Sequence, residues 1–143
     1  MSSQRDDDQT DAIGDQRIII EPNYSVNGLV FGCSCQTLWE RLGEPTRALE
    51  NYNGELELLY DDYFFRCLND RFVECTFPGT YQFYIRDVRI LSVLDWLRGQ
   101  PDHVEKARFH ISPGASMAFD LTNPTAGSVT LFEPGRWDFL LQQ

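Results

Sequence analysis

The stretch from residue 55 to residue 85, ELELLYDDYFFRCLNDRFVECTFPGTYQFYI, decides the fold. Apolar residues alternate with polar ones along much of it, and a period of two is typical of half-buried strands. Asp61-Asp62 and Asn69-Asp70 indicate turns, because Asn and Asp tolerate positive φ, and Pro78-Gly79 precedes the last apolar run. We therefore predict strands over 56–60, 63–68, 71–77 and 81–85. Strands joined by such short turns form an antiparallel meander rather than a parallel sheet.

Two short helices are predicted, one on either side of this meander. Ser34 is suited to begin the first, because its hydroxyl can accept a hydrogen bond from a free backbone amide, and Gly43 ends it. Ser92 begins the second, with Asp95 completing a capping box, and Gly99 ends it. The residues expected on the buried faces are Cys35, Leu38, Trp39 and Leu42 in the first helix, and Val93, Trp96 and Leu97 in the second.

The rest of the chain is predicted to add strands to this core. Ile18, Ile19 and Ile20 are β-branched and indicate a short buried strand. Residues 102–107 are expected to add a helical turn. Further strands are expected over 108–111, 117–121, 128–133 and 137–141. The predicted fold is α+β, with a mostly antiparallel sheet and two short helices packed on one of its faces.

The length of 143 residues is typical of one domain. Residues 1–16 are polar and rich in Asp, with Ala12 and Ile13 as the apolar exceptions, which predicts a disordered acidic tail. Residues 17–143 are then expected to form a single α+β domain.

The chain is strongly acidic, with a formal net charge of −10. Residues 1–16 hold five Asp and one Arg, a net of −4, so −10 − (−4) = −6 belongs to the predicted domain. Negative charge repels phosphates, so we expect no nucleic-acid partner. The same charge attracts a basic protein and speeds the encounter with it.

The start of the chain is polar and lacks the apolar stretch of a signal peptide, and the sequence has no apolar run of membrane-spanning length. We therefore expect a cytoplasmic protein with no membrane partner. In a reducing compartment its cysteines are expected to be buried thiols. They are Cys33, Cys35, Cys67 and Cys75.

The sequence contains no recognisable catalytic or cofactor motif. Cys33-x-Cys35 is not a zinc-type Cys-x-x-Cys, and His103 and His110 have no ligand spacing with the cysteines, so no metal site is expected. The glycines match neither a phosphate loop nor a dinucleotide-binding pattern. We expect a protein without cofactor that is not an enzyme. Two alternatives stay open: a small hydrolase or transferase that uses Cys33 with one of the histidines, and a non-catalytic scaffold subunit of a larger complex.

Tyrosines and acids gather in and beside the predicted meander. Tyrosine offers rigid contact area, and carboxylates steer and pair with basic groups, so this composition favours a surface that binds a protein. The residues expected to contact the partner are Tyr52, Glu55, Glu57, Tyr60, Asp61, Asp62, Tyr63 and Asp70.

The order of these features resembles small immunity proteins of bacterial polymorphic or contact-delivered toxin systems, including type VI secretion systems. The resemblance rests on residues 28–34 (GLVFGCS), a short helix that closes on residues 42–45 (LGEP), the Tyr/Asp-rich meander, and residues 88–90 (VRI) before a second short helix. It extends to residues 128–132 (SVTLF) and a terminus containing Trp137. It implies a non-enzymatic protein that binds and neutralises one cognate toxin in the cytoplasm, with a basic toxin such as a nuclease as the expected partner.

Overall fold

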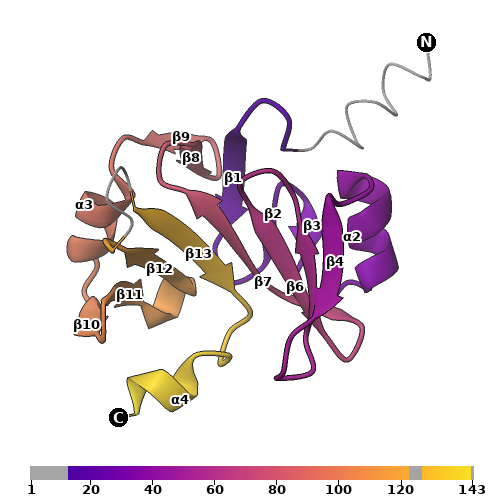
Figure 1. Ribbon diagram of the computed structural model, residues 1–143. Coiled ribbons are helices and arrows are strands. Elements are labelled where there is room, and N and C mark those ends of the chain that lie inside the picture. The colour runs from indigo at the N-terminus through magenta and orange to yellow at the C-terminus, as the bar shows by residue number, and fades with distance from the viewer. Residues whose placement is uncertain (1–12, 123–126, 143) are drawn as a thin grey trace.

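The computed structural model describes residues 13–122 and 127–142, which form two sheets (Figure 1). The larger sheet has eight strands in the order β10-β11-β12-β13-β7-β6-β5-β4, and the smaller has five in the order β3-β2-β1-β8-β9. The strands are β1 (Arg17–Glu21), β2 (Ser25–Val26), β3 (Leu29–Val30), β4 (Arg47–Glu50), β5 (Leu56–Leu59), β6 (Phe64–Leu68), β7 (Arg71–Pro78), β8 (Gln82–Ile85), β9 (Val88–Ile90), β10 (Val104–Lys106), β11 (Phe109–Ser112), β12 (Met117–Asp120) and β13 (Ser128–Phe132). The α+β prediction with mostly antiparallel pairing is confirmed.

The predicted hairpins of the meander form as expected. Strands β5, β6 and β7 pair antiparallel in sequence order. Asn69 and Asp70 make the turn between β6 and β7 at φ of 53° and 59°, the positive values that a two-residue hairpin turn requires. The register shifts beside Arg66, where Val73 is the extra residue of a β-bulge. The bulge brings Phe72 to the same side of β7 as Cys75, so both enter the core.

The prediction that the fourth strand continues the meander is wrong. Strand β8 leaves the large sheet and pairs parallel with β1, Ile18 opposite Phe83, and strand β13 takes the place beside β7. Pro78 ends β7 and Gly79 follows it, so the chain turns away here. A parallel pair requires a long connection, and sixty residues lie between β1 and β8 along the sequence.

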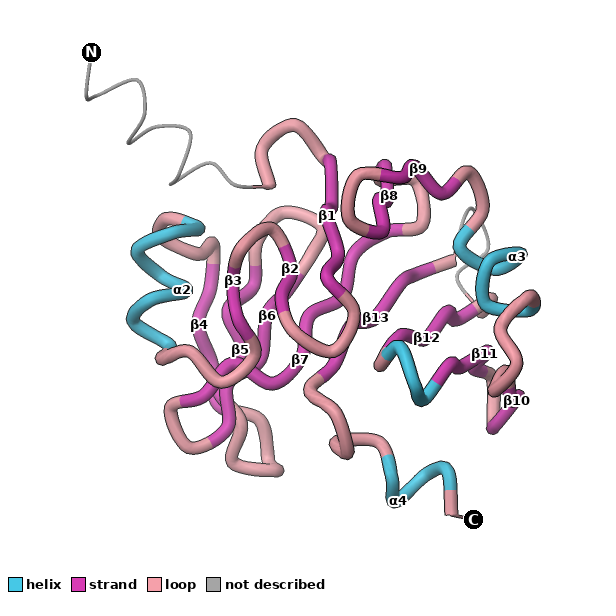
Figure 2. The backbone as a smooth tube through the Cα atoms, turned by 180° about the vertical axis from the view of Figure 1, so that it is seen from behind, coloured by secondary structure: helices cyan, strands magenta, loops and turns pink. Residues whose placement is uncertain are grey.

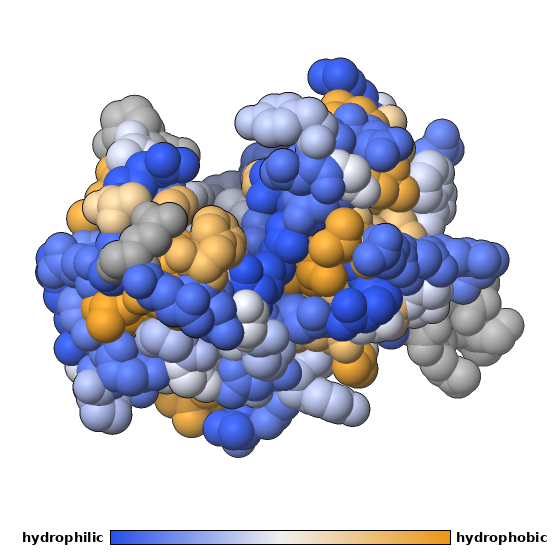
Figure 3. Space-filling model, turned by 90° about the horizontal axis from the view of Figure 1, so that it is seen from below, coloured by the Kyte–Doolittle hydropathy of each residue, from blue (hydrophilic) through white to orange (hydrophobic). Residues whose placement is uncertain are grey.

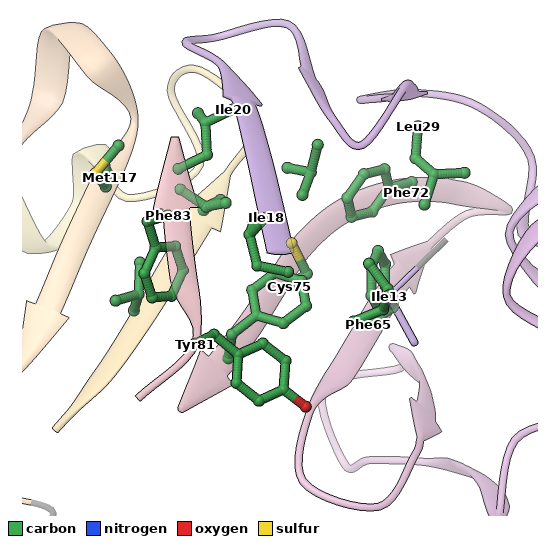
Figure 4. Close-up of a cluster of buried hydrophobic side chains, with 14 of the residues drawn as sticks. Ile13, Ile18, Ile20, Leu29, Phe65, Phe72, Cys75, Tyr81, Phe83 and Met117 are labelled. Carbon is green, nitrogen blue, oxygen red and sulfur yellow. The ribbon is translucent and has the colours of Figure 1, made fainter. Parts of the chain in front are cut away.

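The main core lies between the two sheets. Figure 4 shows Ile18 and Ile20 of β1 among Phe83, Cys75 and Met117 from the other strands. Figure 2 shows β1, β2 and β3 in front of β6 and β7, with α2 and α3 toward opposite ends of the molecule. We call the side of the large sheet that faces this core the front and the other side the back.

Both predicted helices form and pack on the front. Helix α2 (Cys35–Leu42) begins at Ser34, whose side chain accepts from the Thr37 amide, and helix α3 (Val93–Arg98) begins at Ser92. Leu38 of α2 and Leu97 of α3 are fully buried in the same core. The expectation that Trp39 also lies in the buried stripe is wrong, because its side chain is 39% exposed.

Three boundaries differ from the predictions. Ile13, assigned to the tail, is buried in the core beside Phe65 (Figure 4), while residues 1–12 of the predicted tail lie outside the described residues. Residues 104–106 form strand β10 instead of a helical turn, because they pair with β11. The segment predicted as a strand over 137–141 forms helix α4 (Asp138–Leu141). Its apolar residues Trp137, Leu140 and Leu141 follow helical spacing and pack against the back of the large sheet.

Candidate functional site

A row of charged side chains crosses the back of the large sheet. Glu57 on β5 lies directly opposite Arg66 on β6, which lies opposite Glu74 on β7. Their neighbours Leu58, Phe65 and Cys75 point into the front core, so the pleat sends the charged residues to the back. Strand alternation thus builds a carboxylate–guanidinium–carboxylate row across three adjacent strands.

Residues from two loops complete this row. Arg136, which follows β13, places its Nε 2.9 Å from Glu74 Oε1 and its Nη2 2.6 Å from Glu55 Oε2. Arg66 places its Nε 2.9 Å from Glu57 Oε2 and its Nη1 2.5 Å from Glu74 Oε2. Three carboxylates therefore share two guanidiniums. We call these five residues, Glu55, Glu57, Arg66, Glu74 and Arg136, the back-face ion network.

Glu74 is the centre of the network. Its side chain is 4% exposed, and it accepts hydrogen bonds from Arg66, Arg136 and the indole Nε1 of Trp137, the last at 2.9 Å. Trp137 itself stacks on Phe132, which links the network to the apolar cluster on this face. A buried carboxylate is tolerable because charged donors surround it.

Glu55 shows the same balance of burial and pairing. Burial by itself raises the pKa of Glu55, but the Asn51 hydrogen bond and the Arg136 ion pair outweigh it, so its pKa lies below the usual value. Asn51 donates to Glu55 Oε1 at 3.1 Å and to Glu57 Oε2 at 3.0 Å. Hydrogen bonds and ion pairs thus hold the carboxylates of Glu55 and Glu57 in fixed positions.

A pocket of about 540 Å³ opens over the network. Its lining includes the exposed aromatic side chains of Tyr52, fully exposed, and Phe139, 68% exposed, with Phe109 and Leu140. Figure 3 views the molecule from the end at which α4 lies in Figure 1, and it shows strongly hydrophilic side chains between apolar patches. Apolar rim groups around fixed charges suit the recognition of a basic side chain or loop.

Two carboxylates that are paired with arginines, Glu55 and Asp120, predict a loss of stability in acid. For Glu55, and for Asp120 paired with Arg108, burial raises the pKa but hydrogen bonds and the ion pair lower it further. The unfolded state therefore takes up protons first as the pH falls. The stability these groups supply is complete above their unfolded pKa values and is lost as the pH falls through the lower folded values. We expect the share of the free energy of unfolding that Glu55 and Asp120 supply, measured with urea, to hold from pH 7 to about 5 and to fall steeply below.

A matched pair of variants tests whether Glu55 is responsible for the loss of stability on acidification. Glu55→Gln is expected to be less stable than the wild type at pH 7 and to lose less stability on acidification. Asp87→Asn, at an exposed turn between β8 and β9, is the control and should keep the wild-type acid profile. An unchanged acid profile in Glu55→Gln would contradict the assignment.

The structure distributes the eight residues predicted to bind a partner over three places. Tyr52, Glu55 and Glu57 line the back-face pocket. A second group lines a different pocket, of about 360 Å³, where Tyr60 stacks on Tyr63. The residues of the prediction in this second pocket are Tyr60, Asp61, Asp62 and Tyr63.

The second group also has structural partners. The hydroxyl of Tyr60 donates to the Gly43 carbonyl at 2.8 Å, and that of Tyr81 donates to Asp62 at 2.5 Å. Burial, and for Tyr81 the bonded Asp62, raises the pKa of both phenols, so they stay neutral. Asp70, the eighth residue, lies apart and accepts a hydrogen bond from the amide of Cys35 at the start of α2. These contacts tie the second group and Asp70 to the fold.

Most residues that line the back-face pocket were not predicted from the sequence. Arg66 and Glu74 could have been found, since each occupies the outward position of a strand whose neighbours are apolar. Arg136, Trp137 and Phe139 could not, because the strand predicted there is a helix and only the folded chain brings it beside β7.

The cysteine–histidine alternative finds little support in the geometry. Burial raises the pKa of the Cys33 thiol, which opposes the thiolate that a nucleophile needs. Cys33 lies between β3 and α2, whereas His103 and His110 lie at β10 and β11, at the other end of the molecule in Figures 1 and 2. The two histidines contact each other instead, with His103 Nε2 3.0 Å from His110 Nδ1.

Comparisons with protein-family models, with curated proteins and with solved structures found no match. Within residues 13–122 and 127–142, none of the helices combines the length and hydrophobicity needed to cross a bilayer.

Proposed function

We propose that this chain is an immunity protein that binds a cognate bacterial toxin in the cytoplasm and neutralises it by direct contact, with the back-face pocket as its recognition surface. The observation that carries the proposal is the combination of Tyr52 and Phe139, two exposed aromatic side chains, with fixed carboxylates between them. Aromatic anchors beside charged groups are the usual source of binding energy in protein interfaces.

The charge of the pocket favours a basic partner. The network holds three carboxylates and two guanidiniums, a net of −1, and the chain as a whole carries −10. A basic loop of the toxin that enters the pocket would meet carboxylate oxygens at its centre and apolar side chains at its rim. The long-range field would speed the encounter, and salt would slow it.

The pocket is largely preformed, which favours tight binding. Each carboxylate of the network is held by charged or amide donors, so little side-chain freedom is lost when a partner docks. The arrangement of strands and helices described from the sequence is the second line of support, because it resembles immunity proteins of toxin systems.

The test is co-expression with the product of the neighbouring gene. We expect that product to arrest growth when expressed alone, and we expect this chain to restore growth and to co-purify with it as a complex that weakens at high salt. An empty vector is the control for rescue. A harmless neighbour product, or a toxic one that the chain neither neutralises nor binds, would refute the proposal. Stable assembly with a harmless protein would favour the scaffold alternative instead.

A further inference from the structure

The hairpin of β10 and β11 brings three metal-ligating side chains to one side. His110 on β11 lies directly opposite Glu105 on β10, and His103 precedes Glu105 by two residues. Opposite residues of antiparallel strands share a face, so Glu105 and His110 lie together, and His103, just before β10, contacts His110 through its Nε2. One ligand atom from each residue lies within 4.8 Å of the other two.

We propose that His103, Glu105 and His110 form a binding site for a divalent first-row transition-metal ion, with zinc as the ion that fits best. Imidazole nitrogen and carboxylate oxygen are both zinc ligands, and two histidines with one glutamate leave a fourth position for water. His110 follows Phe109 of the pocket lining on β11, so its side chain lies on the opposite face of the strand, and the proposal is independent of the proposed function.

The present geometry requires only a small adjustment to hold the ion. The facing nitrogens of the two histidines are 3.0 Å apart, whereas two nitrogens on one tetrahedral zinc are separated by about 3.3 Å. The ring planes lie within 11° of each other, so one ring must turn for both lone pairs to converge. His103 is half-buried and Glu105 is exposed, which allows both side chains to turn toward the buried His110.

In the metal-free chain a hydrogen bond between the two rings lies where the ion would bind. Glu105 Oε1 lies 4.0 Å from His110 Nε2, the ring nitrogen that does not face His103, so the Glu105 side chain must rotate for one of its oxygens to join the two facing nitrogens. Binding would join β10, the edge strand of the large sheet, to β11 through side chains as well as through backbone pairing.

The experiment is a titration of the full-length, metal-stripped chain with zinc by calorimetry, and with cobalt by visible absorption. We expect one ion per chain and a melting temperature several degrees higher with excess zinc. The sequence contains only two histidines, so imidazole signals in ¹⁵N NMR report on this site alone, and both should shift.

Variants distinguish zinc binding at this site from zinc binding by the cysteine thiols. Glu105→Gln and His103→Gln, each verified as folded by circular dichroism, should lower the zinc affinity at least about 10-fold. Glu40→Gln, an exposed glutamate on α2, is the matched control and should bind as the wild type does. The proposal is overturned if zinc does not bind. It is also overturned if both variants bind normally, or if alkylation of the cysteines abolishes binding while the imidazole signals stay fixed.

Discussion

Replacing Glu74 by alanine is expected to lower the free energy of unfolding by about 3–5 kcal/mol, because it removes one partner of a buried ion network. The variant leaves Arg66, Arg136 and the indole N–H of Trp137 without their common acceptor. Urea denaturation at pH 7 measures the change.

Glu21→Ala is the matched control for this prediction. Glu21 also pairs with an arginine, Arg86, but both side chains are largely solvated, so its removal should cost no more than about 1 kcal/mol. Equal losses in the two variants would mean that the back-face ion network adds nothing beyond an ordinary surface pair.

Replacing Tyr52 by alanine is expected to weaken the complex with the toxin about 30-fold, on the order of 2 kcal/mol, because an exposed aromatic at the pocket rim is a typical interface anchor. The folded chain should be unaffected, since the Tyr52 side chain is fully exposed. Calorimetry with the purified partner gives the dissociation constant.

Tyr24→Ala is the control for Tyr52→Ala. Tyr24 is 58% exposed and lies between β1 and β2 of the small sheet, away from the pocket. Its removal should leave the affinity unchanged. A larger loss of affinity in Tyr24→Ala than in Tyr52→Ala would indicate that the recognition surface lies on the small sheet.

Local signals account for the parts of the fold that could be predicted. Asn69 and Asp70 determine the two-residue hairpin turn between β6 and β7 through their tolerance of positive φ, and Ser34 and Ser92 begin the helices by capping them. The place of β8 could not be predicted in the same way, because its period of two is equally compatible with either sheet. The choice of sheet depends on the pairing of Ile18 with Phe83, which lie far apart in the sequence.

The candidate site was harder to predict for a similar reason. Glu55, Glu57 and Tyr52 were found from composition, but composition also selected Asp62 and Asp70, whose carboxylates bond within the fold. What separates these groups is the pocket that each residue lines, which depends on the folded chain.

Hydrogen exchange of the free chain and of its complex with the toxin is the most direct test of the central claim that the back-face pocket is the recognition surface. Complex formation is expected to slow exchange at the exposed loop of residues 51–54 and across residues 137–141, and to leave exchange in β1, β2 and β9 unchanged. Protection confined to residues 60–63, to the small sheet or to residues 1–12 would contradict it.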